Sequence, residues 1–231
     1  IFGMTLRPGW HSTIFGPYFV LGALFSGVGV LIITMWVYRK MYHLENYFTD
    51  KHFVNLGYIM MVLAGGYGYF TFSEYFTSWF GSAKWDSDVI EKLFNPKEYG
   101  WWTLFANFAG IVLPIVIVAI PATRKRNWIT LAAFLMVMAL WVKRYLIIVP
   151  TLETPALPMQ DTRLNYIKYT ATWPEWALTF AGIASFLLFF TIMSKFVTVV
   201  PVSELEDTSH HPHHDQPAAK AVTEHAQTTK K

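Results

Sequence analysis

Cysteine is absent from the 231-residue sequence, and charged residues make up only 14% of it. Without cysteine, the chain supplies no thiolate ligand to an iron–sulfur cluster, forms no disulfide and performs no thiol catalysis. An ordinary soluble domain carries about 25% charged residues, so the low charge argues against a soluble protein. Hydrophobic residues reach 54% and aromatic residues 18%. Because aromatic residues gather at membrane interfaces as well as in cores, this composition predicts an integral membrane protein.

Histidine is missing from every long apolar run. The eight histidines lie in connecting or terminal segments, at His11, His43, His52, His210, His211, His213, His214 and His225. A haem held between membrane helices usually needs two histidines on facing helices. We therefore expect no bis-histidine haem in this chain.

Long apolar runs are what the sequence has in plenty. A bilayer core about 30 Å thick needs about 20 helical residues, and five runs qualify, at 14–38, 53–80, 101–120, 128–149 and 173–197. These runs are apolar on all sides, whereas the strands of a membrane barrel alternate between apolar and polar residues. The sequence therefore predicts an all-α integral membrane protein, with a four-helix bundle plus one further helix within residues 14–200.

The two ends of the sequence differ from these runs. Residues 1–13 are interpreted as an extracytoplasmic lead-in. Because Ile1 is not an initiator methionine and no signal-peptide pattern follows, we expect a fragment that lacks upstream helices. Residues 201–231 contain no aromatic residue and few large aliphatic ones, which predicts a disordered, His-rich tail.

Basic residues cluster at alternate ends of the apolar runs. Arg39 and Lys40 follow the first run, 124–126 connects the third to the fourth, and Lys195 closes the fifth. The positive-inside rule places these segments and the tail in the cytoplasm, with the N-terminal end outside. The formal net charge of +3 thus indicates membrane topology and not a nucleic-acid partner.

Local features predict how the helices pack and end. Small residues allow close approach between membrane helices, and the first two runs carry them at Gly22, Ala23, Ser26, Gly27, Gly65, Gly66 and Gly68. Pro114 should kink the third span, because proline cannot donate a ladder hydrogen bond. The stretch TWPE, at 172–175, has the spacing of a capping box in which Glu175 closes the start of the fifth helix.

Two adjacent cations, Lys143 and Arg144, lie inside the fourth apolar run. A charge in the middle of a membrane helix costs at least about 2.5 kcal/mol. At 1.5 Å rise per residue, Glu74 on the second run and Arg144 both lie about 8–9 Å from the outer boundary. We expect Arg144 to pair with Glu74, and Lys143 to face a polar or interfacial region.

The sequence leaves two roles open for these charges. One is a salt bridge that locks helices together. The other is a site near the outer face that binds a polar headgroup or relays protons, with Tyr75 and His11 in the same outer half. A quinone ring fits an apolar cleft with a few donors, and its two-electron chemistry needs nearby proton acceptors.

Three stretches, MTLRPGWHSTIFGPYFVLGALFSG, EYFTSWFG and WVKRYLIIVP, resemble the NrfD/PsrC family of polytopic membrane subunits. The resemblance covers nearly all of 1–200 and is strongest to the C-terminal half of larger members, such as the ActC quinol-binding subunit of alternative complex III. It implies two four-helix bundles without a redox cofactor of their own, and quinol or menaquinol as substrate.

The resemblance also implies partners and a location. These are a ferredoxin-like iron–sulfur subunit on the outer face, a second NrfD-like membrane subunit, haem in partner subunits, and the bacterial inner membrane. Two departures stand out. The quinol pocket of larger members draws heavily on an earlier bundle that is absent here, and Lys143 stands where many relatives carry an acid before the arginine.

Three functions follow from the sequence and stay open. The leading one is a quinol-interacting anchor of an alternative complex III-like or molybdopterin oxidoreductase-like complex, with a contribution to proton translocation. The second is a transporter or channel, whose helices are often broken at mid-membrane. Only Pro114 interrupts a span here. The third is a purely structural anchor.

Overall fold

The computed structural model describes residues 10, 12–42, 45, 47–81, 84–153 and 169–196. Within these ranges the chain forms helices and no strand. Five helical stretches are long and apolar enough to cross a membrane, which confirms the predicted spans and the all-α membrane fold. They are Phe15–Met41, Asp50–Phe80, Gly100–Ala119, Arg126–Leu152 and Trp173–Phe196.

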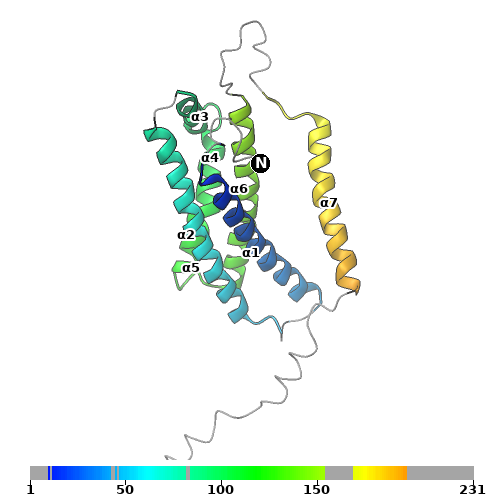
Figure 1. The fold of residues 1–231 in the computed structure, drawn as a ribbon. Helices are drawn as coiled ribbons and strands as arrows, with labels where there is room; N and C mark the ends of the chain where they lie inside the picture. Colours follow the sequence, from blue (N-terminus) through cyan, green and yellow to red (C-terminus); the bar gives the residue numbers. More distant parts are fainter. Residues whose placement is uncertain are drawn as a thin grey trace, which may run out of the picture. The chain divides into compact units, whose positions relative to one another are not determined.

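The first four stretches pack into one bundle (Figure 1). They are α1 (Phe15–Met41), α2 (Asp50–Phe80), α6 (Arg126–Leu152) and a third span made of α4 (Gly100–Asn107), η2 (Phe108–Val112) and α5 (Leu113–Ala119). The core between them contains Phe25, Met60 and Met136, each with no exposed surface. The bundle therefore forms by burying one apolar stripe of each span.

Small residues bring α1 and α2 together. A Cβ atom on Gly22 would lie 3.1 Å from the Tyr67 ring, and one on Gly66 would lie 3.1 Å from Leu21. These distances are too short for a larger side chain without movement of the neighbour. The prediction that small residues mark helix contacts is confirmed at Gly22, Gly66 and Gly68. It is wrong at Gly27 and Gly65, where an added Cβ atom would meet nothing within 4 Å.

The third span is interrupted where proline was expected to disturb it. Pro114 is buried near the start of α5, directly after the π-helical turn η2. The N–H of Leu113 donates to the carbonyl of Phe108, five residues back instead of four. Such turns occur often at functional sites. The third span is thus interrupted by a π-helical turn next to Pro114, the kink itself stays a prediction, and Asn107 lies immediately before the turn.

A short amphipathic helix, α3 (Lys84–Phe94), lies between α2 and α4 at one end of the bundle (Figure 1). Val89 and Leu93 are buried, whereas Asp88 and Glu91 are exposed. The sequence predicted a connection here but not a helix, because an 11-residue amphipathic segment does not resemble a span.

The helix α7 (Trp173–Phe196) belongs to a second unit of the chain, residues 170–231. The backbone N–H of Thr172 donates to Oε2 of Glu175 at 2.7 Å. This bond satisfies one of the free donors at the helix start, which confirms Glu175 as a capping residue.

The predicted lead-in and tail lie almost entirely outside the described residues. Of 1–13, the structure describes Trp10, Ser12 and Thr13, and of 201–231 it describes none. The indole Nε1 of Trp10 donates to the carbonyl of Ile147 at 3.2 Å. This hydrogen bond holds Trp10 against α6.

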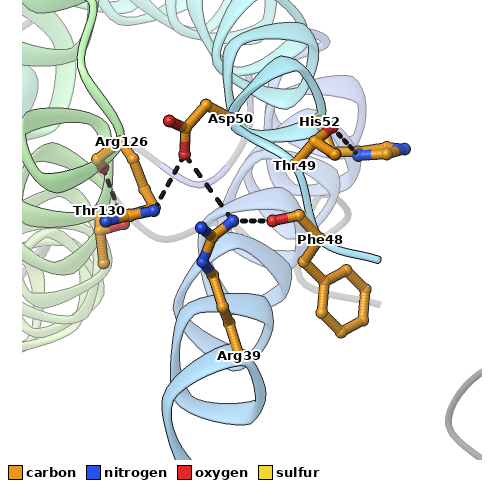
Figure 2. Close-up of polar contacts among 7 residues, drawn as sticks. All are labelled: Arg39, Phe48, Thr49, Asp50, His52, Arg126 and Thr130. Atoms are coloured by element: carbon orange, nitrogen blue, oxygen red, sulfur yellow. Dashed lines mark hydrogen bonds and ion pairs between the residues drawn. The ribbon is translucent and has the colours of Figure 1, made fainter. Parts of the chain in front are cut away.

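A group of three charged residues, the Asp50 clamp, joins three helix ends (Figure 2). The carboxylate of Asp50, at the start of α2, lies 3.0 Å from Arg126 at the start of α6 and 3.8 Å from Arg39 in the last turn of α1. Arg39 also donates to the carbonyl of Phe48. The Asp50 side chain is 70% exposed, so the clamp lies in contact with solvent or the membrane surface.

Candidate functional site

A buried lysine lies at the other end of the bundle. Lys143 on α6 is only 4% exposed. Its ammonium donates to the hydroxyl of Tyr75 on α2 and to Oδ1 of Asn107 on α4, the latter at 3.3 Å. The Nζ atom also lies 4.5 Å from the centre of the Tyr75 ring. We call Lys143, Tyr75, Asn107 and the nearby Glu74 the Lys143 cluster.

The inward position of Lys143 follows from the pattern of α6. Met136, Ala139 and Leu146 are buried at the spacing of three and four residues that marks one helix face, and Lys143 lies on that face. A lysine there loses its hydration, at an effective cost of several kcal/mol unless polar groups replace the water. Tyr75 and Asn107 supply two of those groups.

Glu74 faces Lys143 across a small cavity, the Lys143 cavity. Both residues line it. Among the described residues, no ion pair within 4 Å joins Glu74 to a cation. The cavity is about 50 Å³, enough for water but not for a ring-shaped ligand. Its walls also include Trp10, Ser78, Asp86, Leu146 and Thr151.

Arg144 lies elsewhere, and the predicted ion pair between Arg144 and Glu74 is wrong. Arg144 is exposed, and its guanidinium lies 5.7 Å from the centre of the Phe19 ring. The physical reason is helical geometry, since consecutive side chains point about 100° apart and only one of two neighbours faces the bundle. Lys143, predicted to face a polar or interfacial region, occupies the buried position and faces the polar groups that line the Lys143 cavity.

A second polar contact joins α1 to α2 beside Arg144. The Thr71 hydroxyl donates to the carbonyl of Tyr67 at 2.9 Å, and the hydroxyls of Thr71 and Tyr18 lie 3.2 Å apart. Because the Thr71 proton is already engaged, Tyr18 is the donor of the second bond. The Tyr18 and Tyr67 rings stack with centres 4.6 Å apart. These bonds are satisfied and structural.

Glu153 ties α3 and α4 to the end of α6. Its carboxylate accepts hydrogen bonds from the Tyr99 hydroxyl at 3.1 Å and from the Tyr169 N–H at 2.9 Å. Lys92 donates to its carbonyl at 3.2 Å. Burial, followed by the nearby Glu153 carboxylate, raises the pKa of the Tyr99 phenol well above its usual range. Tyr99 therefore remains a donor throughout the neutral pH range.

The structure brings together three of the five predicted site residues, namely Glu74, Tyr75 and Lys143. Arg144 lies outside the cluster, and His11 lies outside the described residues. Asn107 was missed. As a polar residue inside an apolar run it carried a signal, but its contact with Lys143 depends on the packing of α4 against α6.

The chain is similar in sequence to known membrane proteins. A family model described as "Polysulphide reductase, NrfD" matches residues 2–156, which include every residue of the Lys143 cluster. The chain is also similar to the Hdr-like menaquinol oxidoreductase integral membrane subunit of Archaeoglobus fulgidus, with 26% identity over 209 residues. That alignment covers 86% of this chain and 52% of the relative. The chain thus spans about half the length of the relative it matches.

Proposed function

We propose, since the chain belongs to the NrfD family, that it is a quinol-interacting membrane subunit of a multisubunit respiratory oxidoreductase. Its multi-pass helical bundle and its similarity to a menaquinol oxidoreductase subunit support this function. Electrons from quinol would pass to a ferredoxin-like iron–sulfur subunit. An assembly like alternative complex III, with a second NrfD-like subunit and haem in partner subunits, is the form of the proposal that the sequence favours.

The buried Lys143 cluster is the observation that carries this proposal. Oxidation of one quinol releases two electrons and two protons, so the protons need acceptors close to the ring. Glu74 lies beside a cavity large enough for water, and Lys143 lines the same cavity. In the proposed reaction the electrons leave to the iron–sulfur partner. The two protons leave one after the other through Glu74 and the Lys143 cavity. This path is the proposed contribution of the chain to proton translocation.

The orientation is part of the proposal. We place the Asp50 clamp on the cytoplasmic side of the plasma membrane and the Lys143 cluster near the outer side. Arg39 and Arg126 lie at the Asp50 end of the bundle, and basic residues favour the cytoplasmic side. A topology reporter fused after Lys195 should behave as cytoplasmic. A reporter active on the outer side would reverse this orientation.

Purification of a tagged chain from its own membranes tests the proposed function. We expect an iron–sulfur subunit to copurify, and the preparation to oxidise a menaquinol analogue with an artificial electron acceptor. Arg144→Met is a suitable control, because this cation lies on the same helix but outside the cluster. A chain that purifies without a redox partner and without quinol oxidation would contradict the proposal, and solute uptake by that chain would favour a transporter.

A further inference from the structure

The Asp50 clamp leaves most of its arginine donors unused. Arg126 and Arg39 each approach the same carboxylate atom, Oδ1 of Asp50, through one nitrogen, Nη1, at 3.0 Å and 3.8 Å. The Nη1 atom of Arg39 also donates to the carbonyl of Phe48. Among the described residues, the Nε and Nη2 atoms of both arginines make no hydrogen bond. Because a guanidinium carries five N–H donors, at least three on each side chain remain for another acceptor.

These unused donors can be reached from outside the protein. The side chains of Arg39 and Arg126 are 15% and 31% exposed. Within the described ranges, neither side chain has a fully buried nitrogen without a hydrogen-bond partner, so the unbonded nitrogens are accessible. The two guanidinium groups converge on Asp50 from different helices (Figure 2). The clamp therefore offers accessible donors from two arginines to a second anion beside Asp50.

Positive charge exceeds negative charge at this end of the bundle. In the segments 39–52 and 124–128, the described residues include only two carboxylates but six cations, namely Arg39, Lys40, Lys51, Arg124, Lys125 and Arg126. Arg124 is engaged, because its guanidinium donates to carbonyls at the end of α5. The three lysines are exposed and form no ion pair with a described residue. The surplus of cations attracts an anion from the surroundings.

Tryptophan residues place these cations at the level of lipid headgroups. Trp128, in the first turn of α6, is 50% exposed. The ammonium of Lys40 lies 5.3 Å from the centre of the Trp36 ring, one turn further into α1. Tryptophan gathers where the hydrocarbon core meets the headgroups. Both helices continue as membrane spans with exposed apolar side chains such as Leu31 and Leu131. The anion that suits this position is therefore the phosphate of a lipid.

We propose that the Asp50 end of the bundle binds an anionic phospholipid, whose phosphate accepts hydrogen bonds from Arg39 and Arg126 and whose acyl chains lie against α1 and α6. The planar guanidinium fork matches a phosphate, which suits arginine to such a site. Asp50 holds the two arginines together and competes with the phosphate for them. A zwitterionic lipid would bring a further ammonium into the surplus of cations, so an anionic headgroup such as phosphatidylglycerol binds more tightly.

Photocrosslinking of the purified assembly in lipid nanodiscs tests this site. The nanodiscs contain phosphatidylcholine and a trace of one of two probes, phosphatidylglycerol or phosphatidylcholine, each with the same diazirine-bearing acyl chain. Mass spectrometry identifies the labelled peptides. We expect the phosphatidylglycerol probe to label the Asp50-side halves of α1 and α6 at least about fivefold more than the phosphatidylcholine probe. The outer halves of the same helices should show no preference.

Two variants break the same ion pair but should change this labelling in opposite directions. Arg126→Gln removes a ligand of the phosphate, and labelling by the phosphatidylglycerol probe should fall about fivefold, the effect of one cation near a membrane surface. Asp50→Asn removes the competing carboxylate, and the same labelling should rise about two- to fivefold. A clamp that only held helix ends together would shift both variants in the same direction.

Two lysine variants complete the comparison without touching the clamp. Lys125→Gln removes an exposed cation beside Arg126, and labelling should fall even if Arg126→Gln assembles poorly. Lys97→Gln removes an exposed cation at the other end of the bundle and should leave labelling unchanged. The measurement needs no turnover, so its outcome is independent of the proposed quinol oxidation.

Four results would overturn the site. Equal labelling by the two probes would remove the headgroup preference, and shifts in the same direction for Arg126→Gln and Asp50→Asn would leave the clamp purely structural. Loss of labelling on addition of inorganic phosphate at constant ionic strength would assign the donors to a free ion. Labelling that begins only after partner subunits dissociate would assign this surface to a protein partner.

Discussion

The two ends of the four-helix bundle hold their charges in opposite ways. In the Asp50 clamp, a carboxylate that is 70% exposed lies within 4 Å of Arg39 and Arg126, so opposite charges meet directly. In the Lys143 cluster, a lysine that is 4% exposed bonds to two neutral groups and faces Glu74 only across a cavity. Opposite charges thus meet directly at the accessible Asp50 end, whereas at the buried Lys143 end they are separated by a cavity.

This difference separates a structural role from a functional one. Exposed ion pairs contribute about 0–1 kcal/mol each, enough to favour one arrangement of helix ends at little cost. A buried cation costs several kcal/mol, and an apolar residue of similar size would often be more stable in its place. A bundle that required only stability would therefore gain by replacing Lys143. We infer that Lys143 is present for the chemistry of the site.

The largest expected effect comes from Lys143→Met, which keeps the length of the side chain and removes the charge. Quinol oxidation should fall about 100-fold, the lower range for loss of a group that assists proton transfer. The amount of assembled complex should stay near that of the unchanged protein, because a buried apolar side chain needs no polar partners. Activity per assembled complex and the melting temperature in detergent measure the two effects. Lost assembly with unchanged specific activity would identify Lys143 as a structural lock.

A smaller effect is expected from Tyr75→Phe, which removes one acceptor of the buried ammonium. The stranded donor should lower the free energy of unfolding by about 1–3 kcal/mol. Thermal unfolding in detergent measures this loss. In a Lys143→Met background the same change should have almost no effect, because no ammonium remains to be satisfied. An equal loss in both backgrounds would show that Tyr75 acts through packing alone.

The smallest effect is expected at the other end of the bundle. Asp50→Asn should lower the free energy of unfolding by no more than about 1 kcal/mol, and the loss should shrink in high salt because exposed pairs are screened. Quinol oxidation per assembled complex should not change. Melting curves at low and high salt check this, with the exposed Asp88→Asn as control. A large, salt-independent loss would remove the contrast between the two ends.

The spans, the cap at Glu175 and the interruption at Pro114 could be predicted because each depends on local sequence. The facing of the two cations could not be predicted from depth, since neighbours on a helix differ by only about 1.5 Å along the axis. The direction in which each side chain points around the helix axis decides which of the two cations is buried. Ala139, four residues before Lys143, lies on the buried face of the helix. Two further features depend on how α3, α4 and α6 pack, namely the hydrogen bond between Asn107 and Lys143 and the lack of a hydrogen-bond partner for the Thr103 hydroxyl.

The pairing of Glu74 is the central claim, and a double-mutant cycle on quinol oxidation tests it most directly. Glu74→Gln is combined once with Lys143→Met and once with Arg144→Met. We predict a coupling of about 0.5–3 kcal/mol between Glu74 and Lys143, and additivity within about 0.5 kcal/mol between Glu74 and Arg144. Strong coupling to Arg144 together with additivity at Lys143 would contradict the account.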